Sequence, residues 1–537
     1  MISLTVEGSR IVLAGETKPI YQKINTTPGA RWHPVRKVWS FPATLSNAKR
    51  LRDALPQATT DEAFSAMKAQ AEIAAYAPQR KAMDNYPPIP VTKTAPWKHQ
   101  VIAYWWAHDL RNAMLALDMG TGKSKVVVDL VRNLDLEHIL ILCPLSVVGV
   151  WEGQFNNHAE PPFSVHSLDD DYTVKEKSQQ VDVETNKVFR PGPSIFVTNY
   201  ESAWREPLSD VLLGIEWDLV VLDESHRIKA PGGKASRFVC KLKAARKLCL
   251  TGTPMPHSPL DLYAQFRFLD PGVLGTSFVN FRARYAIMGG YENHQIIGYS
   301  NQEELAQKFD SVAFRVAAAD VLDLPPVQHI ERTCTLGKEA RRVYDELKTE
   351  MIAGVRSGVV TASNALVKLL RLQQITSGFI NDDEHSMVEL DTSKRDLLAD
   401  IMEDLPLTEP VVVFGKFHHD LDMVREVTEK QGRRYGEVSG RRRDLKSWQL
   451  GSLDVLGVQI QSGGVGIDLS RARYGIYVSV GYSLGDYQQS LARLHRPGQT
   501  RPVVFYHLIA TNTIDREVYR ALEDKHDAVL VVLEGMR

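Results

Sequence analysis

The 537-residue sequence lacks the features that mark disulfide-rich, zinc-binding and membrane-spanning proteins. Its four cysteines lie far apart without a CxxC pair, so neither a disulfide framework nor a structural zinc site is expected. No apolar run is long enough to cross a bilayer, and no stretch has the pattern of a signal or transit peptide. The formal net charge is only −1, so any nucleic-acid binding must depend on local basic patches. We expect a soluble, cytoplasmic protein without a membrane partner.

Apolar residues are plentiful: 44% of the chain is hydrophobic and 24% is charged, which is enough for several buried cores. The length predicts about two to four domains. Short apolar runs of strand type alternate with helical patterns in two series, which predicts two parallel sheets with helices on both faces. The first series lies at residues 113–117, 138–143, 194–198, 219–222 and 247–250, and the second at 411–414, 434–438, 455–459, 474–480 and 503–509.

The order of these patterns predicts an α/β chain with a small α+β domain in front. Residues 158–193 are polar and contain prolines, so we expect a surface insertion there. Residues 271–387 turn mainly helical, as in 338–355 and 365–376. The predicted divisions are a basic domain at 1–56, a helix and proline-rich linker at 57–92, a first lobe at 93–270, a helical insertion at 271–390 and a second lobe at 391–537.

A glycine-rich turn, DMGTGKS at residues 118–124, joins the first apolar run of this lobe to an amphipathic segment. A strand, loop and helix of this kind can turn backbone N–H groups toward a phosphate chain, with Lys123 at the β- and γ-phosphates and Ser124 at Mg²⁺. The full GxxxxGK[ST] pattern has glycine where this chain has Leu117, so an ordinary βα turn is the alternative reading of the loop alone. The residues predicted to contact ATP here are Met119, Gly120, Thr121, Gly122, Lys123 and Ser124.

Two acids, Asp223 and Glu224, directly follow the apolar run at 217–222. The carboxyl ends of parallel strands are where such folds bind ligands. We predict that Asp223 holds Mg²⁺ through water and that Glu224 polarises the water that attacks the γ-phosphate. The next run ends in LTGTP at 250–254, whose hydroxyls suit phosphate sensing, although alone the motif would indicate only a turn. The residues predicted to couple these motifs are His226, Thr251, Gly252 and Thr253.

The second lobe contains another glycine-rich turn at 461–468, where Gly466 and Asp468 are predicted to face ATP. Arg493 and Arg496 are three residues apart, so on a helix both would project from one face. Guanidinium groups can fork onto a phosphate and stabilise its developing charge, as arginine fingers do. A solvated basic helix face is the alternative. Gln489 of the same run is assigned to coupling, and the two lobes are predicted to form a cleft that closes on ATP.

Residues 1–56 carry nine Lys/Arg against three acids, a local charge of +6. Basic residues interleaved with aromatic ones can grip phosphates while stacking on bases. We expect Trp32 and Trp39 to form the core of this small domain. Arg31, Arg36 and Lys37 are predicted to contact DNA.

Between Gln100 and Gln499 the motifs resemble, in order, those of the Swi/Snf-type superfamily-two helicase-like ATPases. The stretches that carry the resemblance are DMGTGKS (118–124), DESHRIK (223–229), LTGTP with LDLYAQFRFLDP (250–254 and 260–271), LLRLQQITS (369–377) and RLHRPGQ (493–499). The last is the most diagnostic, because generic DEAH helicases lack it. The chain departs from many members at 481–486, where GYSLGD replaces a Trp-Asn-Pro stretch. Residues 29–42 also resemble, through a few positions, the HARP domain of annealing helicases.

The resemblance implies two tandem RecA-like lobes that use ATP and Mg²⁺, with Gln100 reading the adenine. It implies a DNA-dependent ATPase of compact bacterial or viral form, a monomer that translocates on duplex DNA and remodels forked or branched DNA in repair or recombination. An RNA-dependent DEAH-type helicase is one alternative, which the RLHRPGQ ending disfavours. An ATP-gated DNA clamp with little turnover is another, which Glu224 and the paired arginines disfavour. The DNA contacts predicted on the lobes are Asn199, Tyr200, Ser462 and Gly463.

Overall fold

The computed structural model describes residues 2–8, 10–81, 86–187, 191–289, 295–356, 362–381, 387–461 and 467–534. The chain forms two compact units, one of Met1–Val321 with Ala528–Arg537 and the other of Leu322–Asp527. Among the helices of the described ranges, none combines the length and the apolar character that a bilayer span requires.

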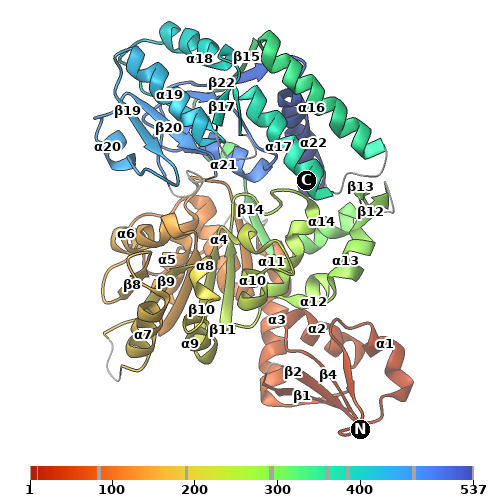
Figure 1. The fold of residues 1–537 in the computed structure, drawn as a ribbon. Helices are drawn as coiled ribbons and strands as arrows, with labels where there is room; N and C mark the ends of the chain where they lie inside the picture. The colour runs from red at the N-terminus through yellow and green to blue at the C-terminus, as the bar shows by residue number, and fades with distance from the viewer. Residues whose placement is uncertain are drawn as a thin grey trace. The chain divides into compact units, whose positions relative to one another are not determined.

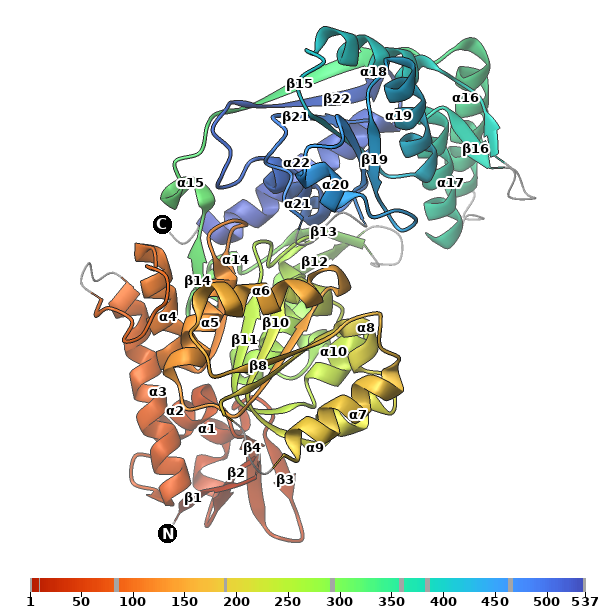
Figure 2. The same ribbon diagram turned by 90° about the vertical axis from the view of Figure 1, so that its left-hand side faces the viewer.

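The first unit begins with a five-stranded sheet in the order β3-β4-β2-β1-β5. Helices α1, α2 and α3 pack against one face of this sheet (Figure 2), because alternate residues of its strands, such as Ile11 and Leu13, are apolar and point to that side. The α+β domain predicted at the N-terminus is therefore present. Its elements are β1 (Ser3–Glu7), β2 (Arg10–Ala14), α1 (Tyr21–Asn25), β3 (Arg31–His33), β4 (Val38–Pro42), α2 (Leu45–Ala54), β5 (Thr59–Thr60) and α3 (Glu62–Lys81).

The main sheet of the first unit has seven parallel strands in the order β14-β6-β11-β10-β7-β9-β8. In β7 the consecutive residues Leu140, Ile141 and Leu142 are all fully buried, so both faces of the sheet are covered. The strands are β6 (Asn112–Leu117), β7 (His138–Cys143), β8 (Ser164–Leu168), β9 (Ser194–Asn199), β10 (Glu216–Asp223), β11 (Lys243–Leu250) and β14 (Ala313–Val316).

Helices of this unit are seen around the sheet in Figure 1. They are α4 (Lys98–Leu110), α5 (Lys123–Asn133), α6 (Val148–His158), α7 (Val174–Thr185), α8 (Tyr200–Ala203), α9 (Leu208–Gly214), α10 (Lys234–Val239) and α11 (Leu262–Leu269). After α11 come α12 (Pro271–Leu274), α13 (Phe278–Tyr285), the hairpin of β12 (Ala286–Gly289) and β13 (Gln295–Tyr299), α14 (Gln302–Asp310) and α15 (Ala318–Val321).

Two predicted insertions turn out to complete the sheets. The polar segment at 158–193 contributes the edge strand β8 and helix α7, whose N-terminus is capped by Thr173 and whose Lys177 is only 2% exposed. The predicted helical insertion at 271–390 contributes β14 to the first sheet and β15 (Val327–Cys334) to the second. The residues of β8 (SVHSL) lack a continuous apolar run because an edge strand is only half buried, so hydrophobic periodicity does not predict this strand.

The N-terminal sheet contacts the rest of the first unit directly. Asp270, the N-cap of α12, accepts hydrogen bonds from the Ser46 hydroxyl at 2.8 Å and the Gly272 N–H at 2.7 Å. Helix α3 packs against α4. Beyond residue 86, Val91 exchanges two backbone-to-side-chain hydrogen bonds of 2.8 Å with Asn133 of α5. The proline-bearing segment that the sequence predicted as a linker is therefore anchored to the lobe at this point.

The second unit is built on six parallel strands in the order β15-β22-β21-β18-β20-β19. The predicted fold class, two parallel-sheet lobes behind a small α+β domain, is confirmed. The remaining strands are β16 (Phe379–Asn381), β17 (Met387–Glu389), β18 (Val411–Gly415), β19 (Tyr435–Val438), β20 (Val455–Gln459), β21 (Tyr474–Tyr477) and β22 (Val503–Ala510). The helices are α16 (Lys338–Arg356), α17 (Ala362–Thr376), α18 (Ser393–Asp404), α19 (His418–Lys430), α20 (Leu445–Gln449), α21 (Leu484–Leu494) and α22 (Ile514–Glu534).

Candidate nucleotide-binding site

Three neighbouring strands of the first unit end side by side and bring three motifs together. Strands β6, β11 and β10 are adjacent and parallel, with Leu115 beside Leu250 and Leu250 beside Asp223. The turns that follow them are the glycine-rich loop, the LTGTP turn and the acidic motif. These turns therefore share the carboxyl edge of the sheet, which is the ligand-binding edge of open parallel sheets.

The glycine-rich loop has a backbone that favours glycine at two positions. Gly120 and Gly122 have φ values of +80° and +84°, in the left-handed region. A Cβ on Gly122 would collide with the side-chain amide of Gln100. Gly122 is also the N-cap of α5, so the first N–H groups of that helix face the loop and form an anion site. Lys123 Nζ donates to the Leu117 carbonyl at 2.8 Å, which keeps the ammonium group at the loop.

Helix α4 braces this loop from its N-terminal end. His99 Nε2 donates a hydrogen bond to the Thr121 carbonyl at 2.8 Å, and Gln100 Nε2 donates to the same oxygen at 3.1 Å. Gln100 Oε1 accepts from the Trp97 N–H at 2.9 Å. Gln100, predicted to read adenine, thus lies beside the phosphate loop, and the exposed Trp97 ring lies at the same end of α4.

Buried donors fix Asp223 at the end of β10. Trp151 Nε1 donates to Oδ2 at 3.2 Å and the Glu224 N–H donates to Oδ1 at 3.0 Å. The Tyr200 hydroxyl donates to the Asp223 carbonyl at 2.8 Å. Burial and the neighbouring Glu224 charge raise the pKa of Asp223 to about 7, while Lys123 lowers it. A carboxyl group in this setting gains from the approach of a cation.

Glu224 connects the acidic motif to the LTGTP turn. Its φ of +49° is rare for a residue other than glycine, and such strain is typical of functional sites. Glu224 Oε2 is 3.4 Å from His226 Nδ1, which lies 3.2 Å from the Thr251 hydroxyl. Thr251 Oγ1 in turn accepts from the Thr253 N–H at 3.0 Å. One continuous chain of polar contacts therefore joins the carboxylate to the turn.

The LTGTP turn lies against the phosphate loop and offers an unused hydroxyl. A Cβ on Gly252 would stand 3.4 Å from both the Leu117 carbonyl and the Met119 nitrogen. The buried Thr253 hydroxyl has no hydrogen-bond partner within the described ranges. Unpartnered buried polar atoms are uncommon in native proteins, and a phosphate oxygen would satisfy this one. The side chains present therefore fit a nucleoside triphosphate.

The same edge fits Mg²⁺ held partly by the nucleotide. Mg²⁺ prefers one or two protein oxygen ligands together with phosphates and water, and Ser124 and Asp223 offer a hydroxyl and a carboxylate. Across the described residues, no group of three or more His, Cys, Asp or Glu side chains forms a self-contained metal site.

In the second unit, Arg493 and Arg496 converge on one carbonyl. Their Nη1 atoms lie 3.5 Å and 3.2 Å from the oxygen of Ile467. The sequence predicted that both arginines project from one face of a helix. Helix α21 ends at Leu494, however, so Arg496 reaches the carbonyl from the loop that follows the helix. Arg496 Nε also lies 3.8 Å from Asp468 Oδ2. The structure thus brings together three predicted residues of this unit, although by loop geometry.

Four other residues of the second unit were predicted to take part in ATP binding, coupling or DNA contact. Gln489 is buried on α21, and its Nε2 has no hydrogen-bond partner among the residues described. Ser462, Gly463 and Gly466 lie outside the described residues.

The predicted DNA contacts at the end of β9 have internal partners instead. Asn199 and Tyr200 are both buried. The Asn199 side chain accepts from Lys177 Nζ at 3.3 Å and donates to Glu201 at 3.2 Å, and the Tyr200 hydroxyl supports Asp223. The sequence placed these residues at the surface because they follow an apolar run. Because α7 packs against the end of β9, these two side chains form hydrogen bonds inside the first unit. We therefore do not retain them as DNA contacts.

The predicted contacts of the N-terminal domain are exposed but not equivalent. Arg31, Arg36 and Lys37 all lie at the surface. Arg36 forms a two-bonded ion pair with Glu7, at 2.7 and 2.8 Å, so its charge is already matched. The two tryptophans also differ: Trp39 belongs to the core, whereas Trp32 is 45% exposed.

The sequence did not predict the role of three residues that support the site from behind. Trp151, Tyr200 and His99 each hydrogen-bond to a motif without belonging to one. Trp151 is separated from Asp223 by 72 positions, so no local spacing reveals the contact. The sequence offers one indication: the N–H of a buried Trp, like the O–H of a buried Tyr, usually needs a hydrogen-bond acceptor.

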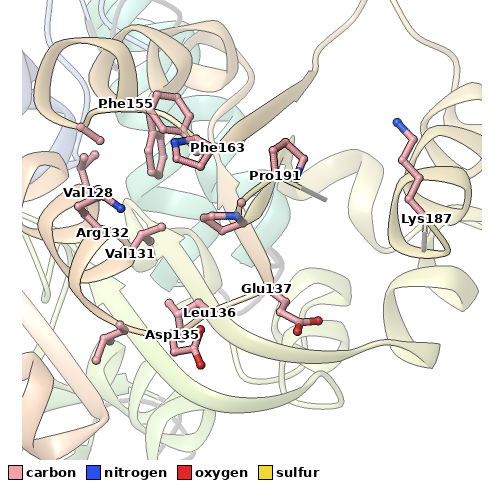
Figure 3. Close-up of a pocket in the computed structure, with 15 residues that line it drawn as sticks. Val128, Val131, Arg132, Asp135, Leu136, Glu137, Phe155, Phe163, Lys187 and Pro191 are labelled. Carbon is pink, nitrogen blue, oxygen red and sulfur yellow. The ribbon is translucent and has the colours of Figure 1, made fainter. Parts of the chain in front are cut away.

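The first unit also contains a cavity of about 580 Å³ between the ends of α5 and α6 and residues 191–193 (Figure 3). The residues that line it include Val131, Phe155 and Phe163, together with the charged Arg132 and Glu137. The cavity lies at the amino ends of β7 and β9. It is therefore at the edge opposite the three motifs and is not part of the candidate site.

Comparisons with known proteins agree with the motifs. The family described as SNF2-related domain matches residues 63–379, more than half of the chain. Protein p41 of Acyrthosiphon pisum secondary endosymbiont phage 1 is 25% identical over 470 residues, which cover 82% of this chain and 98% of the phage protein. The uncharacterized ATP-dependent helicase MG018 of Mycoplasma genitalium is 26% identical over 450 residues, which cover 80% of this chain and 42% of the helicase.

The human DNA repair and recombination protein RAD54B is 22% identical over 473 residues, which cover 76% of this chain and 50% of that protein. The chain thus spans half or less of the length of the mycoplasma and human relatives. The solved Sulfolobus solfataricus SWI2/SNF2 ATPase core in complex with dsDNA aligns at 23% identity with a TM-score of 0.39, over 83% of this chain and 94% of the other.

Proposed function

Because the chain belongs to the SNF2-related family, we propose that it is an ATP-hydrolysing motor that depends on duplex DNA and moves along it. The observation that carries the proposal is the convergence of three motifs on one sheet edge. The phosphate loop, the acidic motif and the LTGTP turn lie at neighbouring strand ends, and polar contacts run from Glu224 through His226 to Thr251.

In the proposed reaction, the first unit binds ATP through its loop and the start of α5. The open N–H groups at Gly122 and beyond receive the phosphates, and Lys123 exchanges the Leu117 carbonyl for a phosphate oxygen. Gln100 is held by Trp97 and Thr121 at the place proposed for the adenine. Binding is therefore assigned mainly to preformed backbone and to one mobile ammonium group.

Hydrolysis is assigned to the acidic motif. Ser124 and Asp223 are the proposed ligands of Mg²⁺, which when bound neutralises phosphate charge. Glu224 orients the attacking water and accepts its proton, and His226 at 3.4 Å keeps that carboxylate in place. Thr253 turns its unused hydroxyl to the γ-phosphate, so loss of that phosphate is sensed by the turn and passed to His226.

Arg493 and Arg496 are proposed to supply charge to the phosphate chain during turnover. Guanidinium groups in this role stabilise charge that develops only in the transition state. Their shared contact with the Ile467 carbonyl holds the two groups together before the reaction. Preorganised donors of this kind need not reorganise at the moment of reaction.

The proposed substrate is forked or branched DNA, which a monomer of the protein remodels as it translocates on the duplex arms in repair or recombination. Support comes from the name of the human relative, which assigns that protein to DNA repair and recombination. The N-terminal domain, with a local charge of +6 and a direct anchor through Asp270, is proposed as a second DNA contact. Contacts to phosphates position a motor without specifying sequence, so a separate module is needed to recognise a junction.

The test compares phosphate release and strand products with single-stranded, duplex, forked and four-way-junction DNA, and with RNA of equal length. We expect duplex-containing DNA to stimulate turnover most, and forks or junctions to be converted to annealed products. Stimulation by RNA as strong as by DNA would favour the DEAH-type alternative. Tight DNA binding with ATP but without phosphate release would favour the clamp.

A further inference from the structure

The face of the N-terminal sheet that carries no helix contains a small basic pocket of about 270 Å³. In β2 and β4, Ile11 and Phe41 point to the helices, so Arg10 and Ser40 point the opposite way. In the register of the sheet, Arg31 of β3 lies directly beside Ser40. Strands β1, β2, β3 and β4 therefore all contribute side chains to one pocket.

Ser40 lines the pocket, and its hydroxyl contacts two neighbouring side chains. Arg10 donates to it from Nε at 3.2 Å and from Nη2 at 2.9 Å, and His33 Nε2 lies 2.7 Å away. Arg10 Nη2 also donates to the Ser40 carbonyl at 2.8 Å and the Gly29 carbonyl at 3.1 Å. These bonds fix the plane of the guanidinium group. Its Nη1 has no acceptor within the described ranges and remains available to a ligand.

The positive charges of Arg10 and Arg31 are not balanced within the pocket. Arg31 forms no ion pair with any described residue, and burial together with the Arg31 charge lowers the pKa of Arg10. Glu7 is the acid in the lining, but Arg36 occupies both of its carboxylate oxygens, at 2.7 and 2.8 Å. The pocket therefore offers two guanidinium groups without a competing carboxylate.

We propose that this pocket binds one phosphate group of single-stranded DNA, with Arg10 and Arg31 as the charged donors and Ser40 and His33 as polar neighbours. Guanidinium groups bind phosphate oxygens through paired hydrogen bonds. The volume is below the range of about 300–1,000 Å³ typical of pockets for larger ligands, which suits one small anionic group. The proposal rests on the proposed function, because it specifies how the N-terminal domain holds DNA.

Trp32, which lies between Arg31 and His33, is the reason for proposing single-stranded and not duplex DNA. Trp32 points to the opposite face of the edge strand β3, next to Trp39 at a ring distance of 5.5 Å, and is 45% exposed. A strand that crosses this edge can place a phosphate on Arg31 and stack an unpaired base on Trp32. The paired bases of a duplex cannot stack in this way.

The proposal is tested with the full chain, without ATP, by fluorescence anisotropy of a labelled single-stranded oligonucleotide at several salt concentrations. Arg31→Ala should weaken binding about tenfold, the size of one lost charge-assisted contact. It should also reduce the magnitude of the slope of log affinity against log salt by about 0.7, the value for one phosphate on a single strand. Trp32→Ala should weaken single-strand binding more than duplex binding.

Two further variants separate a specific pocket from general surface charge. Arg50→Ala removes an equal charge from an exposed position on α2 and should leave affinity and slope unchanged. Glu7→Gln releases Arg36 and should tighten binding. Inorganic phosphate should compete with the oligonucleotide on the wild-type chain.

Equal losses for Arg31→Ala and Arg50→Ala would overturn the pocket, and an equal loss of duplex and single-strand binding in Trp32→Ala would overturn the assignment to a single strand. ATPase of the wild-type chain with duplex DNA is measured in parallel. Failure of that stimulation would contradict the motor, whereas unchanged affinity in Arg31→Ala would contradict only the pocket.

Discussion

The indole N–H of Trp151 donates a hydrogen bond of 3.2 Å to Oδ2 of Asp223, across 72 positions of sequence. Trp151 lies on α6, which follows β7, and β7 is the direct neighbour of the strand that ends in Asp223. This bond and the one from the Glu224 N–H to Oδ1 restrain both oxygens of the carboxylate. Trp151 is thus a positioning residue for the proposed Mg²⁺ ligand.

Trp151→Phe keeps an aromatic ring in the core and removes only the N–H donor. A hydrogen bond to a charged group contributes about 1.5–3 kcal/mol, so we expect half-maximal ATPase to require about tenfold more Mg²⁺. Titration of Mg²⁺ at saturating ATP, with the melting temperature as a check on folding, measures the effect. Trp217→Phe is the matched control, because that equally buried indole donates to the Leu212 carbonyl at 3.0 Å. An identical Mg²⁺ requirement in Trp151→Phe and the wild type would contradict the positioning role.

Lys123→Ala and Glu224→Gln separate binding from hydrolysis. Lys123→Ala should weaken ATP binding and abolish turnover, since it removes the charge that faces the phosphates. Glu224→Gln should bind ATP normally while turnover falls by several orders of magnitude, because Asp223 and the loop remain intact. Equilibrium binding of a fluorescent ATP analogue and steady-state phosphate release measure the two effects. Near wild-type hydrolysis by Glu224→Gln would disprove the assignment of the water-orienting residue.

Arg496→Ala tests the arginines of the second unit. Arg496 is partly exposed, so its loss should disturb folding less than that of the buried Arg493. Turnover should fall by about 10³–10⁵, the range for arginine fingers, with little change in the affinity for ATP. Arg520→Ala, which removes an exposed arginine paired with Glu517, is the control. Parallel losses of ATP binding and turnover in Arg496→Ala would indicate a structural role instead.

Acid should destabilise the second unit through a pair of histidines. His507 Nε2 lies 3.0 Å from His329 Nδ1, and burial, with the His329 charge, lowers the pKa of His507 from 6.5 to about 4. The unfolded chain therefore takes up this proton at higher pH than the folded chain. The neutral His507 therefore contributes its full stabilisation above pH 6.5. As the pH falls from 6.5 toward 4, the free energy of unfolding should decrease by about 3 kcal/mol.

His507→Phe should flatten this dependence, because the substituted residue does not titrate. Calorimetric unfolding between about pH 4 and 7 measures the slope. The exposed His418 on α19 provides a control, and His418→Gln should leave the slope unchanged. The histidine pair would not be the cause if His507→Phe lost stability with acid as steeply as the wild type.

The buried strands could be predicted from sequence because their environment leaves a direct trace in it. Strand β7 occupies the predicted range His138–Cys143, since a strand covered on both faces must be apolar at every position. The edge strand β8 has no such trace, because one side needs no apolar residues. The two tryptophans of the N-terminal domain show the same limit. Trp32 and Trp39 are register partners, yet only Trp39 lies in the core, and edge position is not encoded locally.

In the candidate site, too, some residues could be placed from the sequence and others could not. The position of Lys123, Asp223 and Glu224 at the carboxyl edge of the sheet could be predicted, because each closely follows a buried strand. The support of Asp223 by Trp151 and Tyr200 could not, since it depends on which strands become neighbours in the sheet. Burial of Asn199 depends on α7, a helix formed by a segment that looked like a polar insertion.

The most direct test of the central claim is the rate of phosphate release by the full chain with and without duplex DNA, with Lys123→Ala as a control for contaminating ATPase. The account predicts a low rate without DNA, strong stimulation by duplex, weaker stimulation by RNA of equal length, and no release by the variant under any condition. An ATPase rate that is the same with and without duplex DNA would contradict it.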